Sequence, residues 1–540
     1  MILLLHRNSK EVVKVLVNDE EEYLKEGNLV KVFWECAARY PEEIIAWCDQ
    51  DLKSGINTGT FPEIFHHDLI MASYAVKTRF FTDAIGYIDQ LPFVNVCRKV
   101  HYGTWQMSAD IGGIKGKTLL HFKDVFNQIT NFEMLLNCVG KLGQQNGLFC
   151  YSEPGLVQYN DELHSFTSGI VEQDNELKIN TYKEELLNKA STKELFSFVY
   201  SHYKTVRLFL LFWCFLKYEK KLPIFSFLGA LFNPKFFQTE VDLSGVEIRS
   251  NRYSAIGKDI DVIIPSKGRR EYLLQVLEDL KRQTHLPRKV IVVEQNQDPK
   301  SVTDLPELNA AEWPFKILHH FIHQTGACNA RNIALKEVSA DWIFFADDDN
   351  KMEKDLLENS LKEIKRLGAD MLTFNYRQKN EKLTFDKVKQ WGTFGAGNSL
   401  VSGKFASRIR FDMAFEYGYA EDMDYGMQLR QAGCDIVYHP NIEILHLKAP
   451  RGGFREIVEL PWNREKPKPS PTLMVFMKKH YTSEQLKGYK TELYLRYYKK
   501  QEIKNPVKYI RQMNASWRSS EKWASKLLSK ANNEFIRQSV

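Results

Sequence analysis

Three adjacent carboxylates and a separate acidic pair are the residues of this chain best suited to chemistry. Residues 342–349 read Trp-Ile-Phe-Phe-Ala-Asp-Asp-Asp, and Glu421 and Asp422 follow further along the chain. An apolar run of this length indicates a buried parallel strand, and ligands of open α/β sheets bind beyond the carboxyl ends of such strands. Adjacent carboxylates repel one another unless a cation neutralises them, and oxygen ligands suit Mg²⁺ or Mn²⁺. The triplet therefore predicts a metal-assisted ligand site, the alternative being that it ends the strand and caps the next helix.

The segments before the triplet alternate between strand and helix. Residues 258–264 form a predicted strand that runs into a Pro-Ser-Lys-Gly-Arg turn, and residues 271–283 carry leucines on one helical face. Residues 289–294 are a second predicted strand, and residues 326–332 open another helix. This alternation predicts half of a doubly wound α/β sheet. Backbone amides and cations would gather at its edge, where an anionic ligand could bind.

Four short motifs follow one another in this half of the chain. They are Ile264-Pro265-Ser266, Ala330-Arg331-Asn332, the Asp-x-Asp of Asp347 and Asp349, and Glu421-Asp422. In this order and spacing, residues 258–448 resemble the family 2 glycosyltransferases, which are inverting enzymes of the GT-A fold. The resemblance implies a Rossmann-like, mostly parallel sheet flanked by helices. It also implies sugar transfer from a nucleotide-diphosphate sugar, with uridine diphosphate sugars expected, to a hydroxyl of a glycan or lipid-linked acceptor in cell-surface polysaccharide or glycoconjugate synthesis.

The resemblance further implies a role for residues around the motifs. Asp347 would lie on the ribose side of the donor, and Asp349 would hold Mn²⁺ or Mg²⁺ against its diphosphate. His446 would complete the metal site with these two residues, the alternative being a packed core side chain. Glu294 stands where family members usually carry Asp. The donor-binding residues implied in this way are Pro265, Ser266, Lys267, Arg269, Glu294, Arg331, Asp347 and Asp348.

Sugar transfer requires stabilisation of charge on the leaving group and removal of a proton from the attacking hydroxyl. Asp422 is the expected base, with Glu421 as its substitute or as the residue that orients the acceptor. The alternative is that both residues belong to a first helical turn, where the helix dipole favours acids. Trp391, Gly397 and Asn398 are expected on the acceptor side, because aromatic rings stack on sugars and glycines permit close backbone approach. Buried packing is the alternative for the aromatic ring.

Residues 1–195 look like an altered copy of the same unit. Residues 43–51 echo residues 341–349, and residues 147–154 match residues 433–440 in spacing. Internal similarity of this kind indicates duplication.

The copy lacks the acidic pair. The offsets that place Glu421 and Asp422 before Gly433 fall on Leu135 and Leu136 before Gly147. The copy also reaches its own Asp-x-Asp, Asp49 and Asp51, too soon for a complete nucleotide-binding half. We therefore predict a degenerate, inactive transferase-like domain, although its two aspartates could still bind a metal.

Length and composition fit two tandem GT-A-like domains with a helical, basic tail. The chain has 540 residues, of which 44% are hydrophobic, enough for two cores of ordinary size. Its eight cysteines are scattered, which favours reduced thiols in a cytoplasmic protein, and the first residues do not form a signal peptide. The expected parts are a degenerate domain (1–195), an apolar helical connector (196–255), the catalytic domain (256–463) and the tail (464–540).

Two segments raise the question of membrane contact. The apolar runs 208–216 and 224–232 are each too short to span a bilayer, so they are expected to pack between the two domains, with an interfacial hairpin as the alternative. Residues 448–540 hold 21 Lys and Arg against 8 Asp and Glu, interleaved with aromatic residues. Such a tail suits an anionic membrane surface at the cytoplasmic face. A solvated tail or an oligomer contact is the alternative, and no nucleic-acid-binding motif accompanies it.

Two other functions compete with sugar transfer. A nucleotidyltransferase that builds a nucleotide sugar would share the sheet and the acidic metal site, but it needs a Gly-rich, Arg-bearing loop after the first strand, and residues 265–269 match that loop poorly. A non-catalytic carbohydrate-binding scaffold would explain a degenerate domain. Against the scaffold, the second half of the chain retains every acidic position that the transfer requires.

Overall fold

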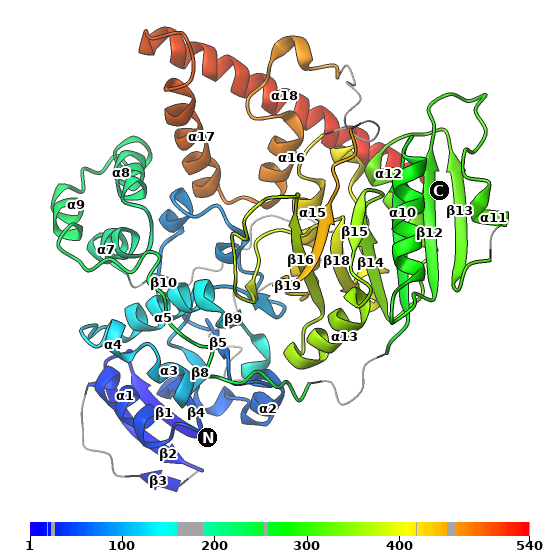
Figure 1. Ribbon diagram of the computed structural model, residues 1–540. Coiled ribbons are helices and arrows are strands. Elements are labelled where there is room, and N and C mark those ends of the chain that lie inside the picture. The colour runs from blue at the N-terminus through cyan, green and yellow to red at the C-terminus, as the bar shows by residue number, and fades with distance from the viewer. Residues whose placement is uncertain are drawn as a thin grey trace. The chain divides into compact units, whose positions relative to one another are not determined.

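The computed structural model describes residues 1–18, 20–22, 28–158, 187–188, 190–252, 257–310, 312–416, 418–450 and 460–538 (Figure 1). The chain forms two compact units, Met1–Arg252 with His480–Tyr497, and Tyr253–Lys479 with Tyr498–Val540. The connector expected at residues 196–255 therefore lies almost wholly in the first unit, as does most of a helix from the expected tail, α17 (Ser483–Tyr498). The boundaries expected at residues 195, 255 and 463 stay predictions.

The second unit is built on a mixed sheet in the order β13-β12-β11-β14-β18-β16-β19-β15, with β17 paired to β19. β11 pairs in parallel with β12 and β14, and β12 with β13, which gives the parallel half predicted from the sequence. The strands are β11 (Ile260–Ser266), β12 (Lys289–Gln295), β13 (Lys316–Ile322), β14 (Trp342–Ala346), β15 (Asn350–Met352), β16 (Met371–Arg377), β17 (Lys389–Gln390), β18 (Asn398–Ser402) and β19 (Val437–His446).

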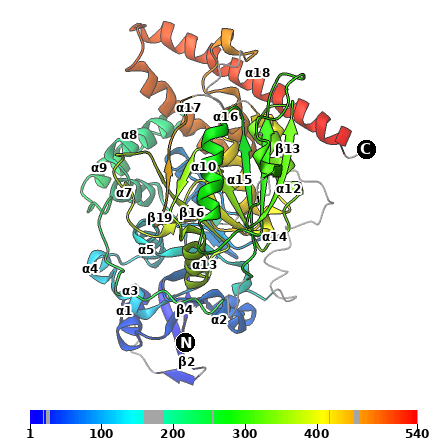
Figure 2. The same cartoon turned by 45° about the vertical axis from the view of Figure 1, so that its right-hand side comes forward.

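Helices connect these strands, and α10 lies against one face of the sheet (Figure 2). Leu273, Leu277 and Leu280 are buried as the helical spacing predicts, and Leu274 is half-buried. The helices of this unit are α10 (Arg270–Lys281), α11 (Glu307–Ala310), α12 (Ala327–Lys336), α13 (Leu356–Leu367), α14 (Gly403–Ala406), α15 (Glu421–Gln431), α16 (Pro471–His480) and α18 (Pro506–Gln538).

Strand β13 pairs in parallel with β12 along its whole length and was not predicted from the sequence. Its sequence, Lys-Ile-Leu-His-His-Phe-Ile, lies at the edge of the sheet and is only half-buried. An edge strand of this kind has no continuous apolar run, which is the signal that identified β11, β12 and β14.

The first unit has a second mixed sheet, in the order β3-β2-β1-β4-β8-β5-β9-β7. Its strands are β1 (Ile2–Arg7), β2 (Glu11–Val17), β3 (Glu20–Glu22), β4 (Ile44–Asp49), β5 (Ile70–Tyr74), β7 (Tyr102–Gly103), β8 (Ile111–Lys115) and β9 (Phe149–Ser152), and β6 (Thr78–Arg79) pairs apart with β10 (Leu187–Asn188). Its helices, besides α17, are α1 (Leu29–Arg39), α2 (Phe61–Ile64), α3 (Gly116–Leu120), α4 (Lys123–Phe126), α5 (Phe132–Asn146), α7 (Thr192–His202), α8 (Thr205–Cys214) and α9 (Ile224–Ala230).

Five strands of each sheet share one topology, which confirms the prediction of tandem domains. In the first unit β1-β4-β8-β5-β9 pair in the sequence parallel, antiparallel, antiparallel, parallel. In the second unit β11-β14-β18-β16-β19 pair in the same sequence. The units differ beside the first strand, where the antiparallel strands β2 and β3 replace the parallel pair β12 and β13. The first unit therefore lacks the half of the sheet on which a nucleotide would rest.

Individual residues match as well as strands. Gly116 donates its N–H to the carbonyl of Glu43 at 2.9 Å, and Gly403 makes the corresponding bond to Asp341 at 2.7 Å. Each glycine opens a short helix directly after its strand. This matching bond, together with the strand pairing, makes residues 43–51 structurally equivalent to residues 341–349, as the similarity between the two sequences predicted.

Two further features concern the length of the helices and the state of the cysteines. Within the described ranges, none of the helices combines the length and the apolar character needed to cross a lipid bilayer. The eight cysteines are free thiols, and all except Cys97 are buried.

The matched glycines lead to a first prediction, on stability. A Cβ at position 116 would lie 2.6 Å from the Tyr40 carbonyl oxygen, and one at position 403 would lie 2.2 Å from that of Ala340. Because backbone atoms cannot move aside, we expect Gly116→Ala and Gly403→Ala each to lower the free energy of unfolding by about 1–3 kcal/mol. Gly245→Ala, where a Cβ would meet nothing within 4 Å, is the control. Denaturant unfolding measures all three, and equal stabilities would contradict the proposed crowding.

Candidate active site

The three aspartates after β14 each have a different set of partners. Asp348 accepts hydrogen bonds from the Ser266 hydroxyl at 2.8 Å and from Arg269 Nη1 at 2.7 Å. The same Arg269 nitrogen lies 3.3 Å from Asp349 Oδ2. Ser266 ends β11 and Arg269 precedes α10, so the turn after the first strand supplies the cation that the triplet requires. At Asp348 the effect of burial is larger than the opposing effect of the Arg269 charge, so the pKa of this carboxyl is raised to about 6.

Asp347 is held from α12 and β16. Its Oδ1 accepts from Arg331 Nη2 at 3.1 Å, and its Oδ2 accepts from the Tyr376 hydroxyl at 3.3 Å. Gly397 lies against the same carboxylate, and a Cβ at that position would come within 2.2 Å of Asp347 Oδ2. The absence of a side chain at Gly397 therefore leaves room for the aspartate. Tyr376 was not identified from the sequence, although it lies near the end of a strand, β16, at the same edge.

Asp349 lies beside His446. Their Oδ1 and Nε2 atoms are 3.4 Å apart, and the histidine ring stacks on Tyr376 with 4.6 Å between centroids. The Ala449 N–H donates to Asp349 Oδ2 at 2.9 Å. Burial favours the neutral acid, but the hydrogen bonds from His446 and Ala449 outweigh it and lower the pKa of the Asp349 carboxyl. His446 is half-buried at the site, and its role as a metal ligand stays a prediction.

Glu421 and Asp422 form the first turn of α15, as the alternative interpretation of this pair predicted. They nevertheless face the site formed by the three aspartates. Asp422 Oδ2 accepts from the Ala396 N–H at 3.4 Å, while its Oδ1 is buried and has no hydrogen-bond partner among the described residues. Burial raises the pKa of Asp422 to about 7; Arg331 opposes the shift and Glu421 adds to it. Burial also raises the pKa of Glu421. The pair therefore contains a carboxyl that can exchange a proton near neutral pH.

Arg331 joins the two acidic groups. Its guanidinium is buried, and its Nε and Nη1 lack a hydrogen-bond partner within the described structure. Burial would lower its pKa, but the negative charges of Asp347, Asp422 and Glu421 raise the pKa above its usual range. Arg331 is therefore a fixed cation between the Asp-x-Asp and the expected base.

Other predicted residues have mainly structural contacts. Glu294 accepts from Thr303 Oγ1 at 2.5 Å, from the Asp304 N–H at 3.1 Å and from His319 Nε2 at 2.8 Å, which closes the loop after β12. Pro265 and Lys267 are half-buried where β11 ends. Their roles, and that of Glu294, in donor binding stay predictions.

The expected acceptor side is built mainly by packing. Trp391 is half-buried and packs against Phe385 and Tyr438, with ring centroids 4.7 and 5.0 Å away. Asn398 donates to the Phe374 carbonyl at 2.6 Å. An acceptor contact at Trp391, Gly397 or Asn398 stays a prediction.

Comparison with known proteins identifies this unit. Residues 261–419 match the model of the family described as "Glycosyl transferase family 2". Residues 261–419 are thus similar to a family 2 glycosyltransferase domain, and we call this part of the second unit the glycosyltransferase domain. The chain is 30% identical over 122 residues to the glycosyltransferase GlyA of Streptococcus pneumoniae serotype 4, which covers 23% of this chain and 17% of that protein. It is also 30% identical over 124 residues to the glycosyltransferase YwdF of Bacillus subtilis, covering 22% and 45%. The chain thus spans less than half the length of these curated relatives.

Solved structures include similar chains. The Staphylococcus aureus protein TarS, residues 1–349 in complex with UDP-GlcNAc, aligns over 52% of this chain and 92% of its own with 13% identity and a TM-score of 0.35. The mannosyltransferase PcManGT from Pyrobaculum calidifontis, in complex with GDP-Man and Mn²⁺, aligns over 52% and 76% with 13% identity and a TM-score of 0.29.

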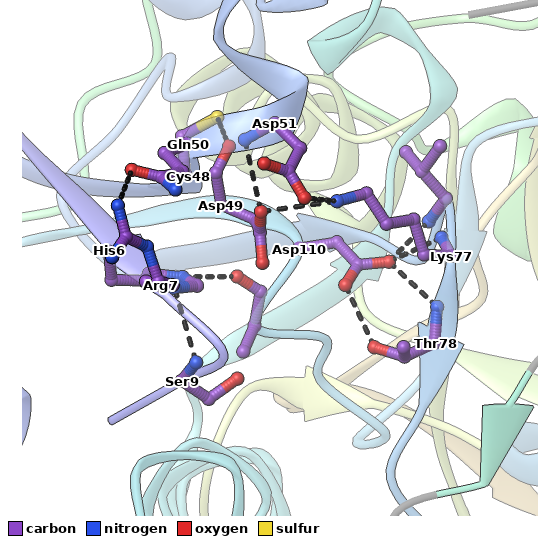
Figure 3. A network of polar contacts seen from close by, with 12 residues as sticks. His6, Arg7, Ser9, Cys48, Asp49, Gln50, Asp51, Lys77, Thr78 and Asp110 are labelled. Carbon is purple, nitrogen blue, oxygen red and sulfur yellow. Dashed lines mark hydrogen bonds and ion pairs between the residues drawn. The ribbon is translucent and has the colours of Figure 1, made fainter. Parts of the chain in front are cut away.

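The first unit carries a different arrangement where the glycosyltransferase domain has its acidic site. Asp49 Oδ1 and Asp51 Oδ2 both accept from the Lys77 ammonium, at 3.1 and 2.9 Å (Figure 3). The Asp110 carboxylate accepts the N–H groups of Val76, Lys77 and Thr78, which fixes the loop that carries this lysine. The Asp-x-Asp of this unit is thus neutralised by a side chain of the unit itself.

The strand pairing shows how the two sites diverged. Cys48 pairs with Ile111, and Ala346 pairs with Asn398, so Asp110 takes the place of Gly397 of the glycosyltransferase domain. Where that domain leaves room for Asp347, the first unit has a carboxylate that anchors the Lys77 loop.

The acidic pair is also absent from the first unit, as predicted. α5 and α15 each lead into a glycine of positive φ, 102° at Gly147 and 89° at Gly433. Counting back from these glycines places Leu135 and Leu136, both fully buried, at the positions of Glu421 and Asp422. Two leucines cannot accept a proton, so the matching positions of α5 carry no counterpart of the expected base.

A second prediction concerns Lys77. Replacement with Met leaves Asp49 and Asp51 facing each other without a cation, so we expect Lys77→Met to lower the free energy of unfolding by about 1–3 kcal/mol. The triple variant Lys77→Met/Asp49→Asn/Asp51→Asn removes the repelling charges and should recover most of this loss. Denaturant unfolding of both variants measures the difference. A triple variant no more stable than Lys77→Met would contradict neutralisation by the lysine.

Proposed function

We propose that this chain is a metal-dependent inverting glycosyltransferase. It would transfer a sugar from a nucleotide-diphosphate sugar, a uridine diphosphate sugar by family resemblance, to a hydroxyl of a glycan or lipid-linked acceptor at the cytoplasmic face of the membrane. The observation that carries the proposal is the carboxylate of Asp422. Its Oδ1 is buried without a hydrogen-bond partner among the described residues, and burial raises its pKa. The charge of Arg331 acts on both this carboxylate and Asp347 of the Asp-x-Asp.

The proposed reaction is a single displacement with Asp422 as base. The acceptor hydroxyl gives its proton to Asp422 as its oxygen forms the new bond to the anomeric carbon. The bond from that carbon to the diphosphate oxygen breaks at the same time, and the nucleoside diphosphate leaves with the electron pair. Because attack and departure occur on opposite faces of the sugar, the configuration inverts. A carboxyl with a pKa near the working pH suits this role, since it is a stronger base than an ordinary aspartate.

The second unit's own cations would serve the donor. Arg269 already contacts Asp348 and Asp349 from the turn after β11, and Arg331 contacts Asp347. Both guanidinium groups are largely buried, and they would stabilise the developing charge of the diphosphate without rearranging.

The residues present also fit a divalent metal. No group of three or more His, Cys, Asp or Glu side chains in the described part of the chain is arranged to hold one, but Asp349 Oδ1 and His446 Nε2 converge to 3.4 Å. A carboxylate and an imidazole form a donor set acceptable to Mn²⁺, and the donor diphosphate would supply further oxygens. When bound, the metal would neutralise charge on the leaving diphosphate. Asp347, held by Arg331 and Tyr376, is the third expected ligand.

The competing functions have less support. A nucleotidyltransferase needs an open, Gly-rich loop after the first strand, whereas here Arg269 of that turn is tied to Asp348 and Asp349. A scaffold without catalysis would describe the first unit, but it would leave the half-buried acid pair of the second unit without a purpose. Incubating the purified chain with a panel of nucleotide sugars, with Mn²⁺, with Mg²⁺ and with a chelator, separates the three functions through release of nucleoside diphosphate. No release from any donor would contradict the proposed transfer.

A third prediction tests the metal site. We expect Asp349→Ala to abolish turnover and to remove the Mn²⁺ dependence of donor binding, because His446 alone cannot hold the ion against the diphosphate. Asp347→Ala should weaken donor binding as well. Titration calorimetry with the donor, with and without Mn²⁺, measures the effect, and Asp386→Ala at an exposed position is the control. Metal-dependent affinity that survives in Asp349→Ala would refute this assignment.

A fourth prediction tests the base. Asp422→Asn retains the shape and removes the proton acceptor, so donor affinity should persist while transfer falls by roughly 10²–10⁴. In the unmodified protein the rate should rise with pH through about 7, because burial raises the pKa of Asp422 and only the carboxylate accepts a proton. The variant should lose this rise. A larger loss in Glu421→Gln than in Asp422→Asn would exchange the two roles.

The raised pKa of Asp422 also predicts how the free energy of unfolding changes with pH. A carboxyl whose pKa is higher in the folded state than in the unfolded state binds more protons when folded. It therefore destabilises the fold as the pH rises from the pKa of the unfolded state towards the folded-state pKa of about 7. Asp422→Asn has no charge to bury and should therefore be at least as stable as the unmodified chain above pH 7. Thermal unfolding at acidic and alkaline pH checks this expectation, and it distinguishes loss of a base from loss of structure.

A further inference from the structure

Helices α8 and α9 of the first unit present a large apolar surface to solvent. On α8 and the turn after it, Val206, Phe209, Trp213 and Leu216 lie three or four residues apart and are 40–65% exposed. On α9 and just after it, Phe225 and Phe232 are 92% and 90% exposed. In Figure 1, α7, α8 and α9 lie together as one group. We call the exposed side chains of residues 206–232 the hairpin face.

The hairpin face is additional to the surface that α8 uses for packing. Leu208, Leu211 and Phe215 point the other way and are buried. A helix that is apolar all round is normally enclosed on all sides, whereas the outward half of this one remains in contact with water. The inner half of this segment therefore packs within the first unit and its outer half lies at the surface of that unit, while the expectation that it packs between the two domains stays a prediction.

Polar contacts fix the turn that joins the two helices. The Tyr87 hydroxyl donates to Glu219 at 2.6 Å, and the Tyr87 and Tyr218 rings stack 5.9 Å apart. The Tyr218 hydroxyl lies 3.0 Å from Thr491 Oγ1 of α17. These bonds hold the turn to its own unit, so the hairpin face keeps one orientation on that unit.

The charges around the hairpin face are positive. Residues 204–235 contain five lysines and one arginine but only one glutamate. Lys217, Lys220 and Lys221 are exposed in the turn between the two helices. Aromatic side chains flanked by lysines are the combination that binds an anionic lipid surface, because the rings enter the headgroup region and the ammonium groups contact the phosphates.

We propose that the hairpin face docks the first unit onto an anionic lipid bilayer. Phe225 and Phe232 would enter the headgroup region, and the lysines of the turn would contact the lipid phosphates. The basic tail is the less suitable candidate, because two of its interleaved aromatic residues, Tyr509 and Trp517, are buried in the second unit. The proposal does not rest on the catalytic role of Asp422 and would stand if that role failed.

Vesicle binding of the full chain tests the proposal. Flotation with vesicles of phosphatidylcholine containing phosphatidylglycerol should carry the protein upward, whereas pure phosphatidylcholine should carry much less. Phe225→Ser/Phe232→Ser should weaken binding by roughly tenfold for each phenylalanine. Val302→Ser, at a residue 81% exposed in the second unit, is the matched control and should bind normally. Lys217→Gln/Lys220→Gln/Lys221→Gln should lose about fivefold for each lysine, only on the anionic vesicles.

A depth measurement identifies the contacting face. Trp213 is one of ten tryptophans and belongs to the hairpin face. Lipids brominated along their acyl chains should quench part of the protein fluorescence, and Trp213→Phe should abolish that quenching when the two proteins are compared at the same bound fraction. Circular dichroism of every variant checks that the fold is retained.

Three outcomes would overturn the proposal. They are flotation that is unaffected by Phe225→Ser/Phe232→Ser, quenching that persists in Trp213→Phe, and absence of binding to anionic vesicles. If binding is absent and the unmodified chain forms a dimer that Phe225→Ser/Phe232→Ser dissociates, the hairpin face is instead a contact between two copies of this chain.

Discussion

Neutralisation of buried carboxylates is the constraint on which the second unit's site depends. Five acidic side chains, from Asp347 to Asp349 and at Glu421 and Asp422, meet at one edge of the sheet, and such a group is stable only where cations lie among them. Arg269 and Arg331 supply those cations from the turn after β11 and from α12. The paths of these two segments are therefore tied to the charges that follow β14. Where compensation is incomplete, at Asp422, the result is a carboxyl whose pKa lies near neutrality.

The first unit meets the same constraint in another way. It retains two of the carboxylates, Asp49 and Asp51, and supplies an ammonium from Lys77, while leucines replace the acidic pair altogether. The shared five-strand topology and the matching Gly116 and Gly403 bonds show that the scaffold persisted while its charges were rearranged. The described strands of the first unit also include β2 and β3 where the second unit has β12 and β13. The two units therefore show which features belong to the fold and which belong to the chemistry.

Much of this arrangement could be predicted from the sequence, because buried parallel strands leave continuous apolar runs and the acids follow those runs directly. The position of Asp347 was predicted in this way, whereas Asp422 and His446 were assigned through the resemblance to family 2 glycosyltransferases, and their roles stay predictions. Contacts made by long-range pairing could not be predicted. Tyr376 reaches Asp347 only because β16 and β14 share a neighbour, β18, and Lys77 reaches Asp49 only because Asp110 holds its loop. The half-exposed β13 lacked the apolar signal. The packing of α17 with the first unit followed from tertiary contacts that leave no local pattern.

The exchange of Gly397 for Asp110 bears on how such a domain changes over evolutionary time. Asp110 holds three consecutive backbone amides, those amides place Lys77, and Lys77 keeps Asp49 and Asp51 compatible. Replacing Asp110 with glycine alone would release the loop that places the lysine. Replacing Lys77 alone would leave Asp49 and Asp51 without a cation. Each single exchange thus leaves charges uncompensated, so these residues form one interdependent set. The first unit is held in its present form by interdependent residues, and it is free to diverge further only on its surface.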